Sequence, residues 1–80
     1  MWLFKKTVED AKAYVNRGAA YRKKGNYDRA IADFNKAIEL DPGCAEAYHN
    51  RGVAYRRKGE HKRAIADLNK AMKLTPMMSR

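Results

Sequence analysis

The chain has 80 residues and carries 18 Lys and Arg against 9 Asp and Glu, which gives a formal net charge of +9 at pH 7. A chain of this length is expected to form a single small domain over residues 1–80, because single domains usually contain about 100–200 residues. A domain this small buries only about 60% of its unfolded surface, which leaves little room for a deep catalytic cleft beside a core. We therefore expect neither enzyme activity nor a cofactor.

Cys44 is the single cysteine, which excludes a disulfide within the chain and a zinc site built on several cysteines. The two histidines, His49 and His61, are twelve residues apart and have no acidic partner at a metal-binding spacing, so we expect no metal. There is no run of 18 apolar residues and no signal-peptide pattern at the start. We expect a protein of a reducing compartment, the cytoplasm, without a membrane span.

The apolar content is low for a folded protein. Leu, Ile, Val and Phe together make up 12 of 80 residues, which with this net charge is typical of disordered chains. Thirteen Ala and five Tyr are the residues that could supply the missing packing.

An internal repeat indicates how these residues are used. Residues 13–42 align with residues 47–76 at an offset of 34 without a gap, and 20 of the 30 positions are identical. A fixed period of about 20–50 residues indicates supersecondary units that pack side by side. Phe34 is replaced by Leu68, so an apolar residue is kept where contact is expected.

The first two helices are predicted over about 8–24 and 27–40, from apolar residues that recur at helical spacing. Thr7 would cap the first helix. Gly25 would end it in the left-handed conformation, which glycine adopts without a steric penalty because it has no Cβ atom. Asn26 would then cap the second helix through its side chain.

The third and fourth helices are predicted over about 42–58 and 61–75 by the same patterns. Asp41 with the following Pro42 would start the third helix, since proline suits the first turn. Gly59 would end that helix as Gly25 ends the first. The joints are short, so neighbouring helices should run antiparallel.

Small side chains should allow the helix backbones to approach closely, while Tyr and Phe fill the gaps between hairpins. The residues with this predicted role are Gly18, Gly52, Ala30, Ala37, Ala64 and Ala71.

This pattern resembles the tetratricopeptide repeat, a helix-turn-helix unit of 34 residues with aromatic, Gly, Tyr, Ala and Pro at fixed steps. The first unit matches it with Tyr14, Gly18, Tyr21, Ala30, Phe34, Ala37 and Pro42. The second unit matches it with Tyr48, Gly52, Tyr55, Ala64, Leu68, Ala71 and Pro76. Arg17 and Arg51 depart from it, because the family often has Leu there.

The resemblance implies an all-α fold of antiparallel helical hairpins stacked as a short right-handed α-solenoid. Repeat 1 would cover about residues 8–41 and repeat 2 about residues 42–75. An apolar extension, residues 1–7, would precede them, and a short tail, residues 76–80, would follow.

The resemblance also implies a concave groove, lined by the first helix of each unit, that binds a peptide or protein partner and has no enzymatic activity. The groove-facing positions would be Lys12, Val15, Asn16, Ala19, Arg22, Lys23, Glu46, His49, Asn50, Val53, Arg56 and Arg57. The predicted partner-binding residues among them are Lys12, Asn16, Arg22, Lys23, His49, Asn50, Arg56 and Arg57. Because most of the charged ones are cationic, we expect an acidic partner.

Three alternatives remain open at this point. The cations that end the helices are also favoured there by the helix macrodipole alone. A strongly basic chain could instead bind RNA or another nucleic acid through its phosphates. The near-perfect internal copy also fits a structural or designed repeat without a natural ligand.

Two repeats should leave apolar faces open at both ends, since stacks generally need about three units. Self-association is therefore predicted, through Trp2, Phe4, Leu68, Met72, Leu74 and Met77. The alternative for the apolar residues at the front is that they extend the first helix and cover its own face.

Overall fold

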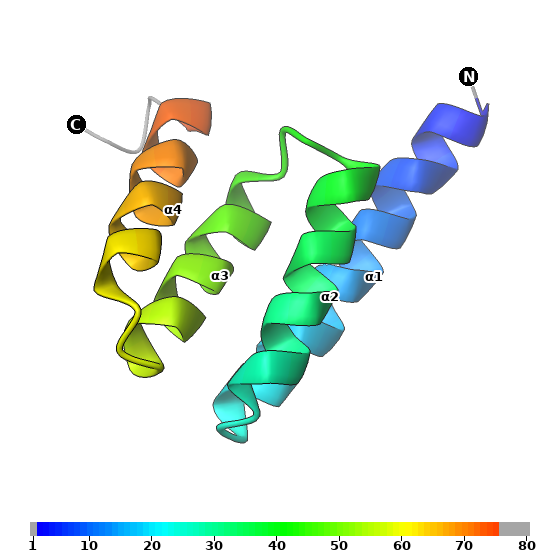
Figure 1. Cartoon of the computed structure of the whole chain (residues 1–80). Helices are drawn as coiled ribbons and strands as arrows, with labels where there is room; N and C mark the ends of the chain where they lie inside the picture. The colour runs from blue at the N-terminus through cyan, green and yellow to red at the C-terminus, as the bar shows by residue number, and fades with distance from the viewer. Residues whose placement is uncertain (1, 76–80) are drawn as a thin grey trace.

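The computed structural model describes the backbone of residues 2–75 and the side chains of residues 7–75. This part of the chain forms four helices and no strand (Figure 1). The helices are α1 (Trp2–Lys23), α2 (Tyr27–Leu40), α3 (Ala45–Arg57) and α4 (His61–Leu74). The prediction of an all-α chain of helical hairpins is confirmed.

The two hairpins stack side by side. Helix α1 packs against α2, and α3 packs against α4. Helix α3 lies between α2 and α4 and also contacts α1, whereas α4 contacts no described helix except α3 (Figure 1). Helices α1 and α3 run in the same direction. The arrangement is that of a short α-solenoid, in which each hairpin contacts only its neighbour.

Both hairpins turn through a glycine in the left-handed region, as predicted. Gly25 has φ of 82° and Gly59 has φ of 86°. After α1, the N–H of Asn26 donates to the carbonyl of Tyr21, and the N–H of Gly25 donates to that of Arg22. This is the Schellman arrangement, which satisfies the last helical carbonyls.

The predicted helix starts are wrong at α1 and α3. Helix α1 begins at Trp2, so Thr7 lies inside the helix and is not its first residue. Helix α3 begins at Ala45, because the Asp41 carboxylate instead accepts a bond from the N–H of Gly43 at 3.2 Å. This bond closes a turn over the two residues after Asp41 and delays the helix.

Asn26 precedes α2 as predicted, but its side chain makes no capping bond. Its ψ of 72° falls short of the extended conformation from which an N-cap side chain reaches the first-turn N–H groups. The backbone carbonyl of Asn26 does accept the first helical bond, from the N–H of Ala30.

Close backbone approach depends on the two helical glycines. A Cβ atom at Gly18 would lie 2.6 Å from Cε1 of Phe34, and one at Gly52 would lie 3.0 Å from Cγ of Leu68. The first distance is too short for van der Waals contact, and the second would require Leu68 to shift by a few tenths of an ångström. The predicted role of these small residues is confirmed.

The hydrophobic core lies mainly in the first hairpin and is closed by the start of α3. Its fully buried members are Ala11, Val15, Ala30, Phe34, Ala37 and Ala47. Tyr14 and Tyr21 are half-buried against this core, and Cys44 joins it from the turn before α3. The second hairpin buries Ala64 and Ala71 but leaves Leu68 half-exposed.

Candidate protein-interaction surface

Two clusters of cations lie at the same end of the molecule. Arg22 and Lys23 occupy the last turn of α1, and Arg56 and Arg57 occupy the last turn of α3. Because α1 and α3 are parallel neighbours, their last turns face the same way (Figure 1). Arg22 is half-buried, whereas the other three are exposed. We call these four residues, with the exposed Lys12 of α1, the basic face.

None of these five cations forms an ion pair with any residue in the described part of the chain. The Nε atom of Arg22 is buried and has no hydrogen-bond acceptor there. Burying a donor without a partner is unfavourable, so an acceptor that reached it would stabilise the side chain.

The two predicted asparagines hold equivalent places on the parallel helices. Asn16 lies on α1 and is exposed, and Asn50 lies on α3 and is half-buried. Each amide carries both donors and an acceptor for a peptide backbone.

One of the twelve predicted groove positions is buried in the structure. Val15 is 2% exposed and belongs to the core, so its assignment to the groove is wrong. Its position on α1 faces α2 and Phe34 rather than solvent. His49, its counterpart on α3, is exposed and lines an open pocket between α3 and α4.

That pocket has a volume of about 720 Å³ and lies at the end of the stack. Glu46 and His49 line it from α3, and Leu68, Ala71 and Met72 line it from α4. We call it the C-terminal pocket. Nearly all of its wall is apolar, since Leu68 and Met72 form much of it.

One buried carboxylate anchors each hairpin, and neither was predicted from the sequence. Asp33 accepts bonds from Nε and Nη2 of Arg17 at 2.9 and 2.7 Å, and Asp67 accepts the same bonds from Arg51 at 2.8 and 2.7 Å. The available signal was an Arg and an Asp sixteen residues apart, identical in both repeats. The bonds from Arg51 raise the pKa of its guanidinium, chiefly through the hydrogen bonds to Asp67.

Arg51 also joins the two hairpins. Its Nη1 donates to the side-chain oxygen of Asn35 on α2 at 2.7 Å. Arg51 consequently has a side chain only 20% exposed, while that of Arg17 is 61% exposed. No described helix packs beside Arg17 in the way that α2 packs beside Arg51.

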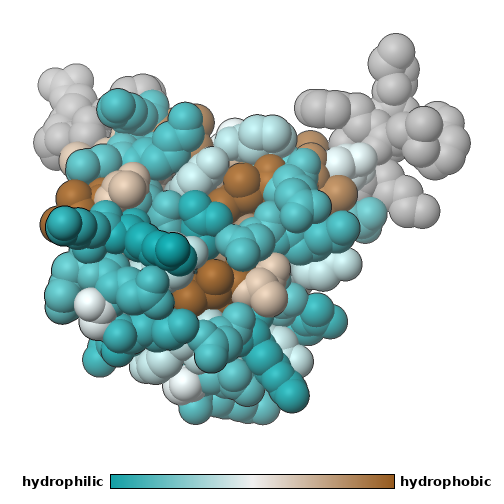
Figure 2. Space-filling model, viewed as in Figure 1, coloured by the Kyte–Doolittle hydropathy of each residue, from teal (hydrophilic) through white to brown (hydrophobic). Residues whose placement is uncertain are grey.

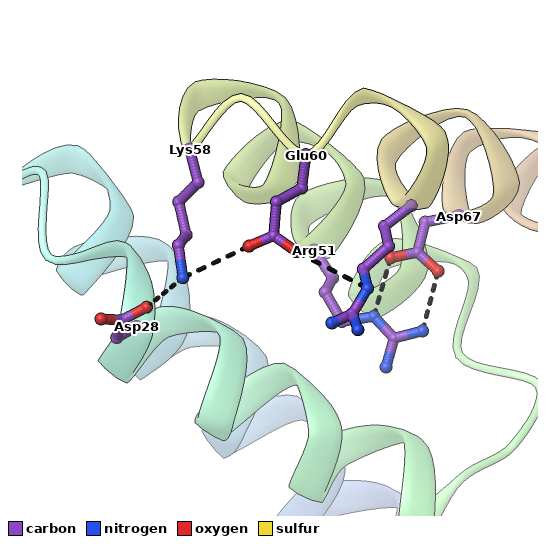
Figure 3. Close-up of polar contacts among 6 residues, drawn as sticks. Asp28, Arg51, Lys58, Glu60 and Asp67 are labelled. Carbon is purple, nitrogen blue, oxygen red and sulfur yellow. Dashed lines mark hydrogen bonds and ion pairs between the residues drawn. The ribbon is translucent and has the colours of Figure 1, made fainter.

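A second polar link between the hairpins lies at the turn after α3 (Figure 3). Nζ of Lys58 donates to Asp28 of α2 at 2.5 Å and lies 3.4 Å from Glu60, which in turn lies 3.5 Å from Nε of Arg63. The hydrogen bond to Asp28 is the main cause that raises the pKa of Lys58.

The four repeat tyrosines are half-buried and covered by arginines. The guanidinium of Arg51 lies 5.3 Å from the ring centre of Tyr48 and 5.7 Å from that of Tyr55. Arg17 lies 5.5 Å from the ring of Tyr14. These distances allow cation–π attraction, which uses ring faces that a nucleic-acid base would otherwise stack on.

The face seen in Figure 2 is mostly hydrophilic, with small separate hydrophobic patches. Two large apolar side chains of the described residues are strongly exposed: Ile65 at 60% and Met72 at 53%. Met72 is among the predicted self-association residues, and Ile65 is not.

The other predicted self-association residues divide into two groups. Leu68 lines the C-terminal pocket and Leu74 is half-buried. Trp2, Phe4 and Met77 are positions whose side chains lie outside the described residues.

Cys44 is half-buried, and burial raises the pKa of its thiol. Across residues 7–75, no three His, Cys, Asp or Glu side chains gather closely enough to hold a metal ion. None of the described helices combines the length and the apolar character needed to cross a membrane.

The fold and the repeated residues define a class of helical-repeat protein. The tetratricopeptide repeat family model matches residues 11–44 and again residues 45–77. The chain therefore belongs to the tetratricopeptide repeat family, and it contains two tandem repeats.

Two curated proteins are similar to one stretch of the chain each. "Protein SGT1 homolog" of Oryza sativa subsp. japonica is 59% identical over 32 residues, which is 40% of this chain and 9% of that protein. "Hsp70-Hsp90 organizing protein 1" of Glycine max is 50% identical over 38 residues, which is 48% of this chain and 7% of that protein. The chain thus spans less than a tenth of either relative.

The solved structures of MamA are similar to most of the chain. One superposes with a TM-score of 0.79 at 33% identity and covers 86% of this chain and 40% of MamA. A second MamA structure gives a TM-score of 0.75 at the same identity and covers 86% of this chain and 38% of that one. The solenoid fold is therefore shared with a solved structure.

Proposed function

We propose that this chain is a protein-interaction module that binds an extended acidic segment of a partner protein along its basic face. Asn16 and Asn50 would bond the backbone of that segment, and the cations would bond its carboxylates. The module works by binding alone, in the cytoplasm. Membership of the tetratricopeptide repeat family supports a protein partner.

The observation that carries the proposal is the lack of ion pairs on the basic face. Three cations that link one helix to another, Arg17, Arg51 and Lys58, hold carboxylates of this chain. The cations of the basic face hold none among the described residues, although the chain carries nine acidic residues. Their charge is therefore available to a partner, and an acidic segment supplies the matching groups.

The covered tyrosines favour a peptide over a nucleic acid. Sequence-tolerant binding of single strands relies on aromatic rings that stack on bases. Here Tyr14, Tyr48 and Tyr55 are half-buried and already lie against guanidinium groups. A nucleic acid would find phosphate-binding cations but few free ring faces.

The test is fluorescence anisotropy with a labelled Glu-rich decapeptide at increasing salt. We expect affinity to fall steadily with ionic strength, because exposed charges are screened beyond about 10 Å at 0.1 M salt. The double variant Arg56→Gln/Arg57→Gln should weaken binding about tenfold, which corresponds to about 1.4 kcal/mol.

The matched control is Lys62→Gln/Lys70→Gln, which removes the same charge from exposed positions on α4. It should leave affinity within about twofold, since it lies off the basic face. Equal losses in both double variants, or tighter binding of a single-stranded RNA of the same charge, would contradict the proposal. Circular dichroism of each variant checks that helix content is unchanged.

Self-association is a second proposed activity, and the exposed side chains of Ile65 and Met72 favour it. Exposed apolar side chains next to an apolar pocket mark an interaction site. A weight-average mass that rises with protein concentration would support self-association, and a constant monomer mass would exclude it.

A further inference from the structure

The chain contains one complete joint between hairpins, and each of its ends presents one half of the same joint. Within the chain, α3 packs on the outer face of the first hairpin. We call this contact the internal joint. Ile31 on that face is 9% exposed, whereas its counterpart Ile65, 34 residues later, is 60% exposed. The hairpins are near copies, so the difference measures what α3 covers.

The other half of the joint lies on α1. Ala47 and Ala54 of α3 are fully buried, yet their counterparts Ala13 and Ala20 on α1 are exposed. If the α3–α4 hairpin itself buried these alanines, the equivalent α1–α2 hairpin would bury Ala13 and Ala20 as well. They are therefore buried by the first hairpin across the internal joint.

The two open pockets correspond to these two halves. A pocket of about 420 Å³ on α1 is lined by Asp10, Ala13, Tyr14 and Arg17. Their counterparts are Cys44, Ala47, Tyr48 and Arg51, among which Cys44 and Ala47 belong to the packed core and Arg51 bonds Asn35. We call this face of α1 the N-terminal face. Three of these four residues are identical in the α3 surface that closes the first hairpin.

We propose that the C-terminal pocket of one chain receives the N-terminal face of a second copy of this chain, in the register of the internal joint. This inference rests on the self-association proposed above and specifies its geometry. Head-to-tail contact of this kind does not close on itself, so it builds a continuous solenoid from separate chains.

Individual contacts are preserved or changed in a defined way. The bond from Arg51 to Asn35 would recur between Arg17 of the incoming copy and Asn69, because both residues are kept in the repeat. Val15 belongs to the core and Cys44 packs against it, and their counterparts are His49 and Asp10, so the joint between copies would bring an imidazole and an acid to the same region.

One contact changes from attractive in the internal joint to repulsive between copies. The ion pair of Lys58 with Asp28 corresponds to Lys24 of the incoming copy and Lys62, which are both cations. Like charges at this point weaken the association at low salt. Added salt should therefore strengthen head-to-tail association, in the opposite direction to its effect on acidic-peptide binding.

The experiment is sedimentation velocity on the full chain at 0.5 M salt. It includes two double variants, each of which blocks one half of the joint between copies. Ala13→Gln/Ala20→Gln fills the N-terminal face, and Ile65→Gln/Met72→Gln makes the C-terminal half of the joint polar, at Met72 in the C-terminal pocket and at the exposed Ile65 of α4. All four positions are exposed in the single chain, so the fold should tolerate them. The matched control is Ala32→Gln/Ala66→Gln, at alanines that are exposed in both repeats.

We expect the original chain and the control to form a concentration-dependent series of oligomers, and each blocked variant alone to remain monomeric. An equimolar mixture of the two blocked variants should form a dimer and nothing larger, because each contributes one intact half. Lys62→Asp should strengthen association about fivefold, since it restores the ion pair of the internal joint.

Three results would overturn the inference. The original chain could be monomeric at all concentrations. The Ala13→Gln/Ala20→Gln chain, which is the N-terminal-face variant, could associate as strongly as the original chain, or the mixture could form no dimer. The second result would leave self-association standing through another surface. Peptide binding is measured separately on the N-terminal-face variant, which keeps the basic face, so the two proposals can fail independently.

Discussion

Ile31 and Ile65 are the same residue at the same place in two equivalent helices, and the first is buried while the second is 60% exposed. Their local sequences are almost identical, so nothing in the helices themselves accounts for the difference. Helix α3 packs against α2, which carries Ile31, whereas α4, which carries Ile65, contacts no described helix except α3. In a repeat protein the neighbour, rather than the local sequence, decides how much a residue is buried.

Replacing Gly18 by Ala should destabilise the chain by about 1–3 kcal/mol, as overpacking does. The new Cβ would lie 2.6 Å from the ring of Phe34, which is fully buried and cannot turn away. Alanine's better helix propensity, about 1 kcal/mol, offsets only part of this. Urea unfolding followed by circular dichroism measures the change. Gly43→Ala is the control, since its Cβ meets nothing closer than 3.7 Å.

Arg51→Met should cost about 2–3 kcal/mol and Arg17→Met about 1 kcal/mol, because unpairing a buried carboxylate leaves it without its charged hydrogen bonds. Both variants leave a buried aspartate without its arginine partner, but Arg51 is less exposed and also bonds Asn35 across the joint. Urea midpoints compare the two variants directly. Equal costs would show that the link to the first hairpin adds nothing.

Lys58→Met should change how stability depends on pH at the alkaline end. The pKa of Lys58 is raised by Asp28 in the folded chain. A raised folded pKa gives stability that is complete below the ordinary lysine value, about 10.4, and is lost as pH rises through the folded pKa.

The measurement is the difference in unfolding free energy between the original chain and Lys58→Met at pH 7 to 12. The difference should stay constant up to about pH 10 and shrink above it. Lys62→Met, at an exposed lysine of α4 that forms no ion pair with a described residue, is the matched control. A difference that is the same at all pH values would mean that the Lys58–Asp28 pair contributes nothing through its charge.

Cys44 should react slowly with iodoacetamide in the folded chain. Burial raises the pKa of its thiol, so a smaller fraction is thiolate at a given pH than in the unfolded chain. Labelling followed by mass spectrometry, with and without 8 M urea (about the concentration that unfolds most small domains), measures the ratio. The folded rate should rise as pH increases beyond the ordinary thiol range. Equal rates in both states would contradict a buried thiol.

The helical periodicity, the repeat offset and the two turn glycines predicted the elements from the sequence. The second helix was placed at 27–40, and the structure has Tyr27–Leu40. The starts of α1 and α3 were misplaced, because capping was inferred from residue type. Whether Asp41 caps a helix or closes its own turn depends on the backbone angles around it, and the one-dimensional pattern does not contain them.

The candidate surface was predicted less completely. The cations at the ends of α1 and α3 were found, since they recur in both repeats. Val15 was assigned to the groove because helical periodicity fixes which residues share a face but not which face meets a neighbour. The pairs Arg17–Asp33 and Arg51–Asp67 went unnoticed, although both residues of each pair repeat.

The sequence by itself determined that this chain forms two near-identical helical hairpins, because apolar spacing, glycines and the 34-residue offset are local properties of the chain. Only the tertiary structure decided which copy of each residue is buried. Packing needs a partner surface, and in a linear stack the first and last hairpins each lack one. That is why Ala47 is buried and Ala13 is exposed, although the two alanines stand in equivalent helices.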